Sequence, residues 1–195
     1  MTTRWRHWTT AVSLAVAVML LLSTCGWVPA GDADSTGLAA ANELQATDFP
    51  IVVYDGGGLL AGPETSFAEV LRLGRPVVLN MWAGLCPPCR LEMPDFEQVS
   101  VEFGDRVLFL GLDVGPFTNL GSSRDGQDLI RELGITYPTG TTTDPATVRD
   151  YQVLGMPTTY FIMPDGQILR RWTGVLTADQ LSELVQELLD SAAGS

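Results

Sequence analysis

The sequence predicts an α/β fold with a central mixed β-sheet flanked by helices. Two nearly continuous apolar runs, residues 76–82 and 107–114, are typical of strands that are buried on both faces. Segments with apolar residues at helical spacing alternate with these runs, which favours a strand-helix-strand unit. Strand-like segments followed by turn residues occur near both ends of the folded part. The sequence therefore predicts one domain built on one sheet.

The first elements are a hairpin and a short helix. Residues 51–54 predict a strand that turns at residues 55–58, as the start of an N-terminal β-hairpin. Ser66 and Glu69 have the spacing of a capping box, which predicts a short helix after Ser66. Gly74 is expected to end that helix.

The first buried strand leads directly into the two cysteines Cys86 and Cys89. After them, residues recur at roughly helical spacing until Gly104, which predicts a long helix that starts near Cys86. The recurring positions are Glu92, Met93, Phe96, Val99 and Phe103. The thiols are thus expected at the carboxyl end of a central strand, where open α/β sheets place their sites.

Two helices are expected after the second buried strand. Residues 125–133 predict the first, with Leu129, Ile130 and Leu133 on one side. The second is indicated by Asp144 as a cap and is expected to end at Gly155.

The C-terminal part predicts a β-hairpin followed by a helix. Residues 158–163 and 167–172 form two strand-like segments around the turn Pro164-Asp165-Gly166. Thr177 and Gln180 then form a capping box for the last helix. Its apolar face consists of Leu181, Leu184, Val185, Leu188 and Leu189.

Residues 1–30 predict a targeting segment, in which a basic start precedes an apolar run over residues 11–22. Trp8 and Trp27 bracket a segment about as long as a hydrocarbon core, which favours a retained membrane anchor. A cleaved signal peptide stays open as an alternative. A lipoprotein does too, because Leu22-Ser23-Thr24-Cys25 resembles a bacterial lipobox in which Cys25 is lipidated. Each outcome places the domain outside the cytoplasm, where disulfide chemistry can operate.

The remaining chain divides into a polar linker over residues 31–47 and a domain over residues 48–193. The formal net charge is −12, and the chain contains no lysine. Such a chain is a poor partner for nucleic acid. The acidic residues are scattered, which is typical of a solvated surface.

Two thiols separated by two residues can close on each other, and a thiol at a helix N-terminus has a lowered pKa. Half of a zinc site is one alternative for Cys86 and Cys89. It would need two more ligands, but the third cysteine and the single histidine, Cys25 and His7, lie in the targeting segment. A purely structural disulfide stays open as a second alternative, although such a small loop would stabilise the fold little. No metal or other cofactor is expected.

With these elements in this order, the chain resembles the thioredoxin superfamily, and within it the membrane-tethered TlpA, ResA and CcmG kind of thiol-disulfide oxidoreductase. The resemblance covers residues 48–189. It rests on Val78-Leu79-Asn80-Met81-Trp82-Ala83, on Cys86-Pro87-Pro88-Cys89-Arg90-Leu91-Glu92-Met93-Pro94 and on Gly155-Met156-Pro157-Thr158-Thr159-Tyr160-Phe161. It implies a thioredoxin-like fold, and the helix at residues 125–133 looks like the helical insertion of that branch.

The resemblance implies that Cys86 is the attacking thiol, that Cys89 is the resolving thiol, and that the two form a redox-active disulfide. Where plain thioredoxins have a buried aspartate in the central strand, this chain has Asn80, which cannot carry a proton. Glu92 lies one helical turn after Cys89, and relatives of the TlpA kind have an acid there. A buried carboxyl has a raised pKa, so Glu92 is the expected proton shuttle. The alternative is a glutamate that only complements the helix N-terminus.

The resemblance also implies a substrate-binding surface around the thiols. Pro157 looks like the cis-proline that faces the thiols in this fold, and the backbone of Met156 is expected to pair with an extended substrate. The other expected contacts are Trp82, Leu85, Pro87 and Pro88. Packing in the core is the alternative role of Met156, whereas for Trp82 packing beside the site is favoured over substrate contact. Leu85 replaces an aromatic residue common in these proteins, which affects the docking surface rather than the chemistry.

The function expected from the resemblance is exchange of disulfides with protein substrates on the outer face of a bacterial cell membrane. A reductant fed by a membrane electron donor is favoured, as in cytochrome c maturation, and a monomer is expected. The alternatives are an oxidant of the same fold, a tethered metal-binding or protein-binding module, and a peroxiredoxin-type peroxidase. The Thr-x-x-Cys pattern expected of the peroxidase is absent at the thiols.

Overall fold

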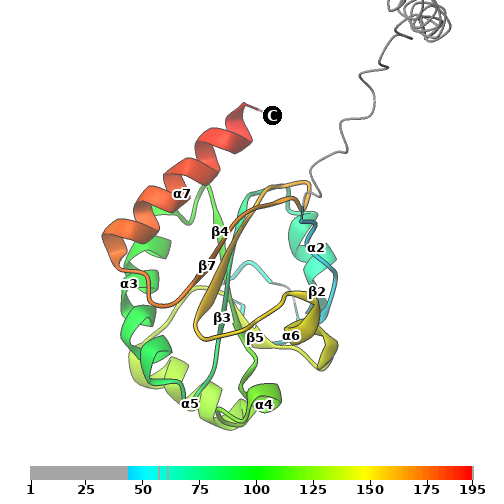
Figure 1. Cartoon of the computed structure of the whole chain (residues 1–195), viewed down its shortest axis with the longest axis vertical. Helices are drawn as coiled ribbons and strands as arrows, with labels where there is room; N and C mark the ends of the chain where they lie inside the picture. Colours follow the sequence, from blue (N-terminus) through cyan, green and yellow to red (C-terminus); the bar gives the residue numbers. More distant parts are fainter. Residues whose placement is uncertain (1–43, 57, 61, 195) are drawn as a thin grey trace, which may run out of the picture. The chain divides into compact units, whose positions relative to one another are not determined.

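A seven-stranded mixed sheet with the order β2-β1-β5-β4-β3-β6-β7 forms the centre of the molecule (Figure 1). The computed structural model describes residues 44–56, 58–60 and 62–194. The strands are β1 (Pro50–Asp55), β2 (Glu64–Ser66), β3 (Val77–Trp82), β4 (Leu108–Asp113), β5 (Thr139–Thr141), β6 (Thr158–Ile162) and β7 (Ile168–Thr173). The helices are α2 (Phe67–Leu71), α3 (Pro87–Phe103), α4 (Gly115–Thr118), α5 (Ser123–Leu133), α6 (Ala146–Asp150) and α7 (Ala178–Ala193).

Strands β3, β4 and β5 are parallel, and β1 and β6 pair antiparallel with β5 and β3. Helix α3 connects β3 to β4, and α5 lies in the connection from β4 to β5. The hairpins β1–β2 and β6–β7 extend the sheet on its two sides. The predicted mixed α/β architecture, with its N-terminal hairpin and its inserted helix α5, is therefore confirmed.

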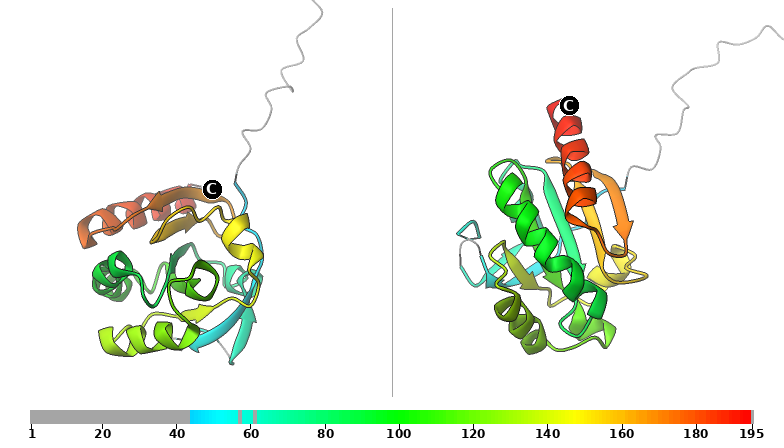
Figure 2. Two further views of the ribbon diagram at one scale, coloured as in Figure 1. Left: turned by 60° about the horizontal axis from the view of Figure 1, so that its bottom comes forward. Right: turned by 90° about the vertical axis from the view of Figure 1, so that its left-hand side faces the viewer.

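Helices cover both faces of the sheet. In Figure 1, α3 and α7 lie on one side of the strands, while α2 and α6 lie on the other, and Figure 2 shows the same separation. Because side chains alternate along a strand, β3 serves both layers. Val78 and Trp82 belong to the core under α3, α5 and α7, whereas Val77, Leu79 and Met81 belong to the core under α2. This double burial explains the continuous apolar run at residues 76–82.

Two elements, β5 and α4, are not among the predicted ones. Strand β5 has only three residues, Thr-Gly-Thr, and it exists because β1 and β4 pair with its two edges. Helix α4 is a single turn after β4. Neither element is long enough to show a hydrophobic periodicity in the sequence.

Some helix ends differ from the prediction. The Ser66 side chain caps α2 by accepting from the Glu69 amide, but the Glu69 carboxylate pairs with Arg72 instead of completing a capping box. Helix α6 ends at Asp150 rather than near Gly155, and the intervening residues form the loop that enters β6. The capping box of α7 is present as predicted, with its N-cap at Thr177.

Backbone hydrogen bonding within the domain begins before Asp48, the predicted first residue of the domain. Gln45 forms a bridge with Gln167, and the Ala46 amide donates to the Gly166 carbonyl at 2.9 Å. The predicted linker is therefore too long at its C-terminal end. The targeting segment, including Cys25, lies outside the described residues. Among the residues that are described, no helix combines the length and the apolar character needed to cross a membrane.

Candidate functional site

Cys86 and Cys89 form a disulfide at the N-terminus of α3, with their Cα atoms 5.3 Å apart. After β3 ends at Trp82, the chain turns so that the Cys86 amide donates to the Ala83 carbonyl at 3.2 Å. Cys86 is the N-cap of α3, and its Sγ accepts a hydrogen bond of 3.3 Å from the Cys89 amide. In the reduced protein the same amide and the helix dipole stabilise negative charge on Cys86.

Cys86 is the less buried of the two cysteines. It is 3% exposed, whereas Cys89 is completely buried. Leu85 is 60% exposed beside it, and Pro87 is also exposed. The half-buried Pro88 completes the first turn of α3, where a missing N–H costs nothing. An incoming sulfur therefore meets Cys86 first, within an apolar surface.

The segment before Cys86 is held against the region that follows β4. The Leu85 amide donates to the Leu120 carbonyl at 2.8 Å. Gly84 lies directly on the first turn of α5, because a Cβ atom there would be 2.5 Å from the backbone of Asp125 and Gly126. Only glycine allows this close approach. The inserted helix thus fixes the path of the chain into the redox pair.

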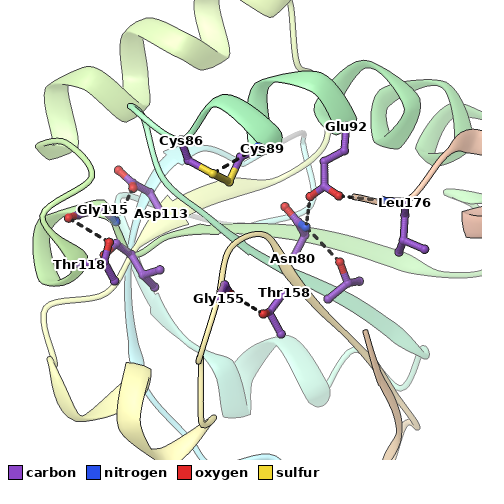
Figure 3. Close-up of a disulfide and its surroundings, with 12 residues drawn as sticks. Asn80, Cys86, Cys89, Glu92, Asp113, Gly115, Thr118, Gly155, Thr158 and Leu176 are labelled. Atoms are coloured by element: carbon purple, nitrogen blue, oxygen red, sulfur yellow. Dashed lines mark hydrogen bonds between the residues drawn. A yellow bond between two sulfur atoms is a disulfide. The ribbon is translucent and has the colours of Figure 1, made fainter. Parts of the chain in front are cut away.

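The loop before β6 contains Met156 and Pro157. The Met156–Pro157 peptide bond is cis, as the resemblance implied. Pro157 is buried, Met156 is half-buried, and the Pro157 carbonyl accepts from the Gly174 amide at 2.9 Å. Thr158 fixes this loop by donating its hydroxyl to the Gly155 carbonyl at 2.7 Å (Figure 3). The pairing of Met156 with a substrate stays a prediction.

Glu92 is completely buried one turn after Cys89, on the side of the disulfide that carries that thiol (Figure 3). Its Oε1 accepts from the Asn80 amide nitrogen Nδ2 at 2.8 Å, and its Oε2 accepts from the Leu176 backbone at 3.1 Å. Burial raises the pKa of Glu92 to about 7, and the two hydrogen bonds only partly oppose this effect. Glu92 can therefore exchange a proton near neutral pH.

A second buried acid, Asp113, lies at the end of β4 on the Cys86 side of the disulfide (Figure 3). Its Oδ1 accepts from the Gly115 amide at 2.9 Å, and its Oδ2 accepts from the Tyr54 hydroxyl at 3.0 Å. Burial raises the pKa of Asp113 to about 6. Asp113 is not among the predicted site residues. The signal available in the sequence was a charged residue inside the otherwise apolar run of residues 107–114.

Trp82 does not present a surface to a substrate. It is 0% exposed and belongs to the same buried cluster as the two cysteines. Gly111 leaves room for the indole, because a Cβ atom there would lie 2.8 Å from the indole nitrogen. Of the two roles considered for Trp82, this structure shows the favoured packing role and no surface for substrate contact. Leu85, Pro87, Pro88 and Met156 keep accessible surface.

The described residues contain no group of three or more His, Cys, Asp or Glu side chains arranged to hold a metal ion. The redox pair and the buried carboxyls of Glu92 and Asp113 are the reactive groups seen at the site.

Comparison with known proteins agrees with this geometry. Residues 44–171 match the AhpC/TSA family over most of the sheet. The chain belongs to the AhpC/TSA family. Within this thioredoxin-like family, its relatives are proteins of the ResA and DsbE kind, which confirms the resemblance drawn from the motifs.

Two relatives are named thiol-disulfide oxidoreductases. The thiol-disulfide oxidoreductase ResA of Oceanobacillus iheyensis is 30% identical over 115 residues, which cover 59% of this chain and 58% of the relative. The sporulation thiol-disulfide oxidoreductase A of Bacillus subtilis is 26% identical over 179 residues, which cover 89% of this chain and 97% of the relative. The chain thus spans less than two thirds of the first relative and nearly all of the second.

A solved structure confirms the fold. A putative thiol:disulfide interchange protein DsbE from Chlorobium tepidum superposes with a TM-score of 0.59 at 22% identity. The superposition covers 76% of this chain and 94% of that protein. At this identity, the likeness establishes the thioredoxin-like fold of this family member and no more.

Proposed function

We propose that this AhpC/TSA family member is a thiol-disulfide oxidoreductase that exchanges disulfides with protein substrates through Cys86-Pro87-Pro88-Cys89. The observation that carries the proposal is the Cys86–Cys89 disulfide at the N-terminus of α3, in which Cys86 is 3% exposed and Cys89 is completely buried. The names of the relatives support the same reaction class.

The first step joins Cys86 to the substrate. The Cys86 thiolate attacks one sulfur of a substrate disulfide, so a Cys86–substrate disulfide forms and the other substrate sulfur leaves as a thiolate. The start of α3 lowers the free energy needed to form the attacking thiolate, because the Cys89 amide already points at Cys86 Sγ. The exposed Leu85 and Pro87 provide the apolar surface on which a protein segment would lie.

The second step releases the substrate and requires that Cys89 lose its proton. We assign the acceptor role to Glu92, which lies one turn further along α3 and has a pKa raised to about 7. The Cys89 thiolate then attacks Cys86 Sγ, the Cys86–Cys89 disulfide forms, and the second substrate sulfur leaves. Glu92 can pass its proton to a departing thiolate, so protons and electrons balance over the cycle.

The proposed direction is reduction of the substrate, with electrons returned to the oxidised pair by a membrane donor. The domain would act on the outer face of a bacterial cell membrane, tethered through residues 1–30 by an anchor or by lipid on Cys25. These points rest on the sequence resemblance and on the basic-then-apolar character of that segment. An oxidant would use the same residues in the opposite direction.

The reaction is tested by reduction of insulin with the full chain in detergent. Cys86→Ser should abolish turnover, and Cys25→Ser, the same change at the third cysteine, should leave it intact. Full activity of Cys86→Ser would refute the proposal. Equilibration against glutathione then decides the direction, because a pair that stays oxidised in strongly reducing buffer supports the reductant. Peroxide consumption without a thiol substrate would instead favour a peroxidase.

A further inference from the structure

Asp113 is a buried acid that the exchange mechanism above does not use. It pairs with Trp82 in the β3–β4 register, so its side chain starts at the strand end from which the redox segment leaves. None of the ion pairs between described residues involves it. Its two hydrogen-bond donors are the Gly115 amide and the Tyr54 hydroxyl, both neutral. An ionised Asp113 is therefore a buried negative charge without a cation.

The carboxylate is packed against the same backbone that positions Cys86. A Cβ atom on Gly115 would be 2.9 Å from Asp113 Oδ1 and 3.2 Å from the Cβ of Ala83. On the other side, a Cβ atom on Gly126 would be only 2.2 Å from Asp113 Oδ2. The same turn of α5 is in close contact with Gly84. Asp113 thus has contacts with both elements that hold the segment leading to Cys86.

The two buried acids lie on opposite sides of the disulfide. In Figure 3, Asp113 lies on the Cys86 side and Glu92 lies on the Cys89 side. The other titratable groups that face Asp113 are Tyr54 from β1 and Asp125 from α5. Burial raises the pKa of Tyr54 to about 12, so Tyr54 is neutral at physiological pH. Asp125 is a further negative charge, which disfavours ionisation of Asp113.

We propose that Asp113 is a positioning residue of the redox site, whose negative charge disfavours the Cys86 thiolate and whose contacts with Gly115 and α5 hold the segment that enters Cys86. A like charge in a poorly solvated environment opposes ionisation of a thiol, and Cys86 is the thiol on the Asp113 side of the site. The reactivity of Cys86 would therefore depend on pH through Asp113 as well as through its own proton.

The test is the alkylation rate of Cys86 in the reduced full chain, measured by iodoacetamide labelling and peptide mass analysis. With Asp113→Asn, Cys86 should be alkylated about fivefold faster than in the unmodified protein at pH 7.5, where Asp113 is ionised. At pH 5, where Asp113 carries a proton, the two rates should agree. A purely structural role would change both rates by the same factor, and either that result or equal rates at pH 7.5 would overturn the proposal.

Two further variants sharpen the test. Asp128→Asn removes an exposed charge from the same helix α5 and should leave both rates unchanged. Tyr54→Phe removes the hydroxyl that stabilises the Asp113 carboxylate, so its rate should exceed that of the unmodified protein near pH 6.5 and match it near pH 8. If Asp113→Asn does not fold, the alkylation rates of Cys86 in Tyr54→Phe alone decide whether the proposal holds. The assay follows Cys86 alone, so its result is independent of whether protein disulfides are the substrates.

Discussion

Asn80 Nδ2 donates a hydrogen bond of 2.8 Å to Glu92 Oε1, which joins the central strand to the helix that carries both thiols. Asn80 also donates to the Thr159 hydroxyl at 3.1 Å, while its own Oδ1 has no partner among the described residues. A protonated Glu92 could donate to that oxygen if the Asn80 amide turned over. Asn80 can therefore serve either charge state of Glu92, whereas an ionised aspartate at the same position could only accept a hydrogen bond.

Replacing Asn80 by aspartate should make stability strongly dependent on pH. Asn80→Asp places a second buried carboxyl in contact with Glu92, and two such groups share one proton rather than ionise together. We expect a loss of about 3 kcal/mol in the free energy of unfolding at pH 8 and a smaller loss at pH 5. Urea denaturation at both pH values measures these losses in the free energy of unfolding. Gln127→Glu adds an acid on exposed α5 and should show no such difference.

Glu92→Gln should remove a pH dependence that the unmodified protein has. Because the pKa of Glu92 is raised from 4.5 to about 7, its protonation favours the folded state, and this contribution is lost as pH rises through 7. Relative to Glu92→Gln, the unmodified protein should lose about 2 to 3 kcal/mol of stability between pH 5 and pH 8. A constant difference in denaturation midpoint across this range would contradict the assignment. The glutamine retains a carbonyl for the Leu176 amide.

Cys89→Ser should trap the first intermediate. With no resolving thiol, the disulfide between Cys86 and a substrate protein has no internal route to release. Non-reducing electrophoresis after mixing with an unfolded disulfide protein should show a covalent adduct that reductant removes. The double variant Cys86→Ser/Cys89→Ser should form none. Adduct formation by the double variant would mean that another cysteine reacts.

Gly126→Ala should destabilise the fold although alanine is the better helix former. The new methyl group would lie 2.2 Å from Asp113 Oδ2 and 3.4 Å from the indole of Trp82. We expect a cost of about 2 to 3 kcal/mol in thermal or chemical unfolding. Gln127→Ala, at the next and exposed position of α5, should be neutral or slightly stabilising. Equal effects of the two variants would argue against the close packing.

Leu85→Ala should selectively weaken the binding of protein substrates. Leu85 is 60% exposed beside Cys86, so its loss removes docking surface without disturbing the core. We expect KM for a protein disulfide to rise several-fold, while the rate with a small disulfide stays the same. Leu91 is 72% exposed further along α3 and provides the matched control, Leu91→Ala. A similar change in KM for Leu91→Ala would place the docking surface elsewhere.

The long elements and the redox pair could be predicted because each leaves a local signal. The burial of β3 on both faces appears as an unbroken apolar run, and the role of Cys86 as a helix N-cap follows from its spacing to Cys89 and to the apolar positions of α3. Strand β5 left no such signal, because Thr139–Thr141 becomes a strand only when β1 and β4 are already in place.

The environment of the site depended on contacts between distant residues and was harder to predict. The burial of Glu92 could be expected from its helical face, but its bond to the Leu176 amide joins residues far apart in the chain. The same holds for Asp113, whose partner Tyr54 lies on β1, 59 residues earlier in the chain and separated from β4 by β5. The role of Trp82 stayed open between packing and substrate contact for a related reason, because only the bare backbone of Gly111 leaves room for its indole.

The burial of Trp82 in one cluster with Cys86 and Cys89 gives the protein an internal optical reporter. A disulfide quenches the emission of a nearby indole by accepting an electron from its excited state, whereas two thiols do so less efficiently. Reduction should therefore brighten the fluorescence of this chain, and the change should be absent in Trp82→Phe but retained in Trp172→Phe. The redox state could then be followed in real time without any added dye.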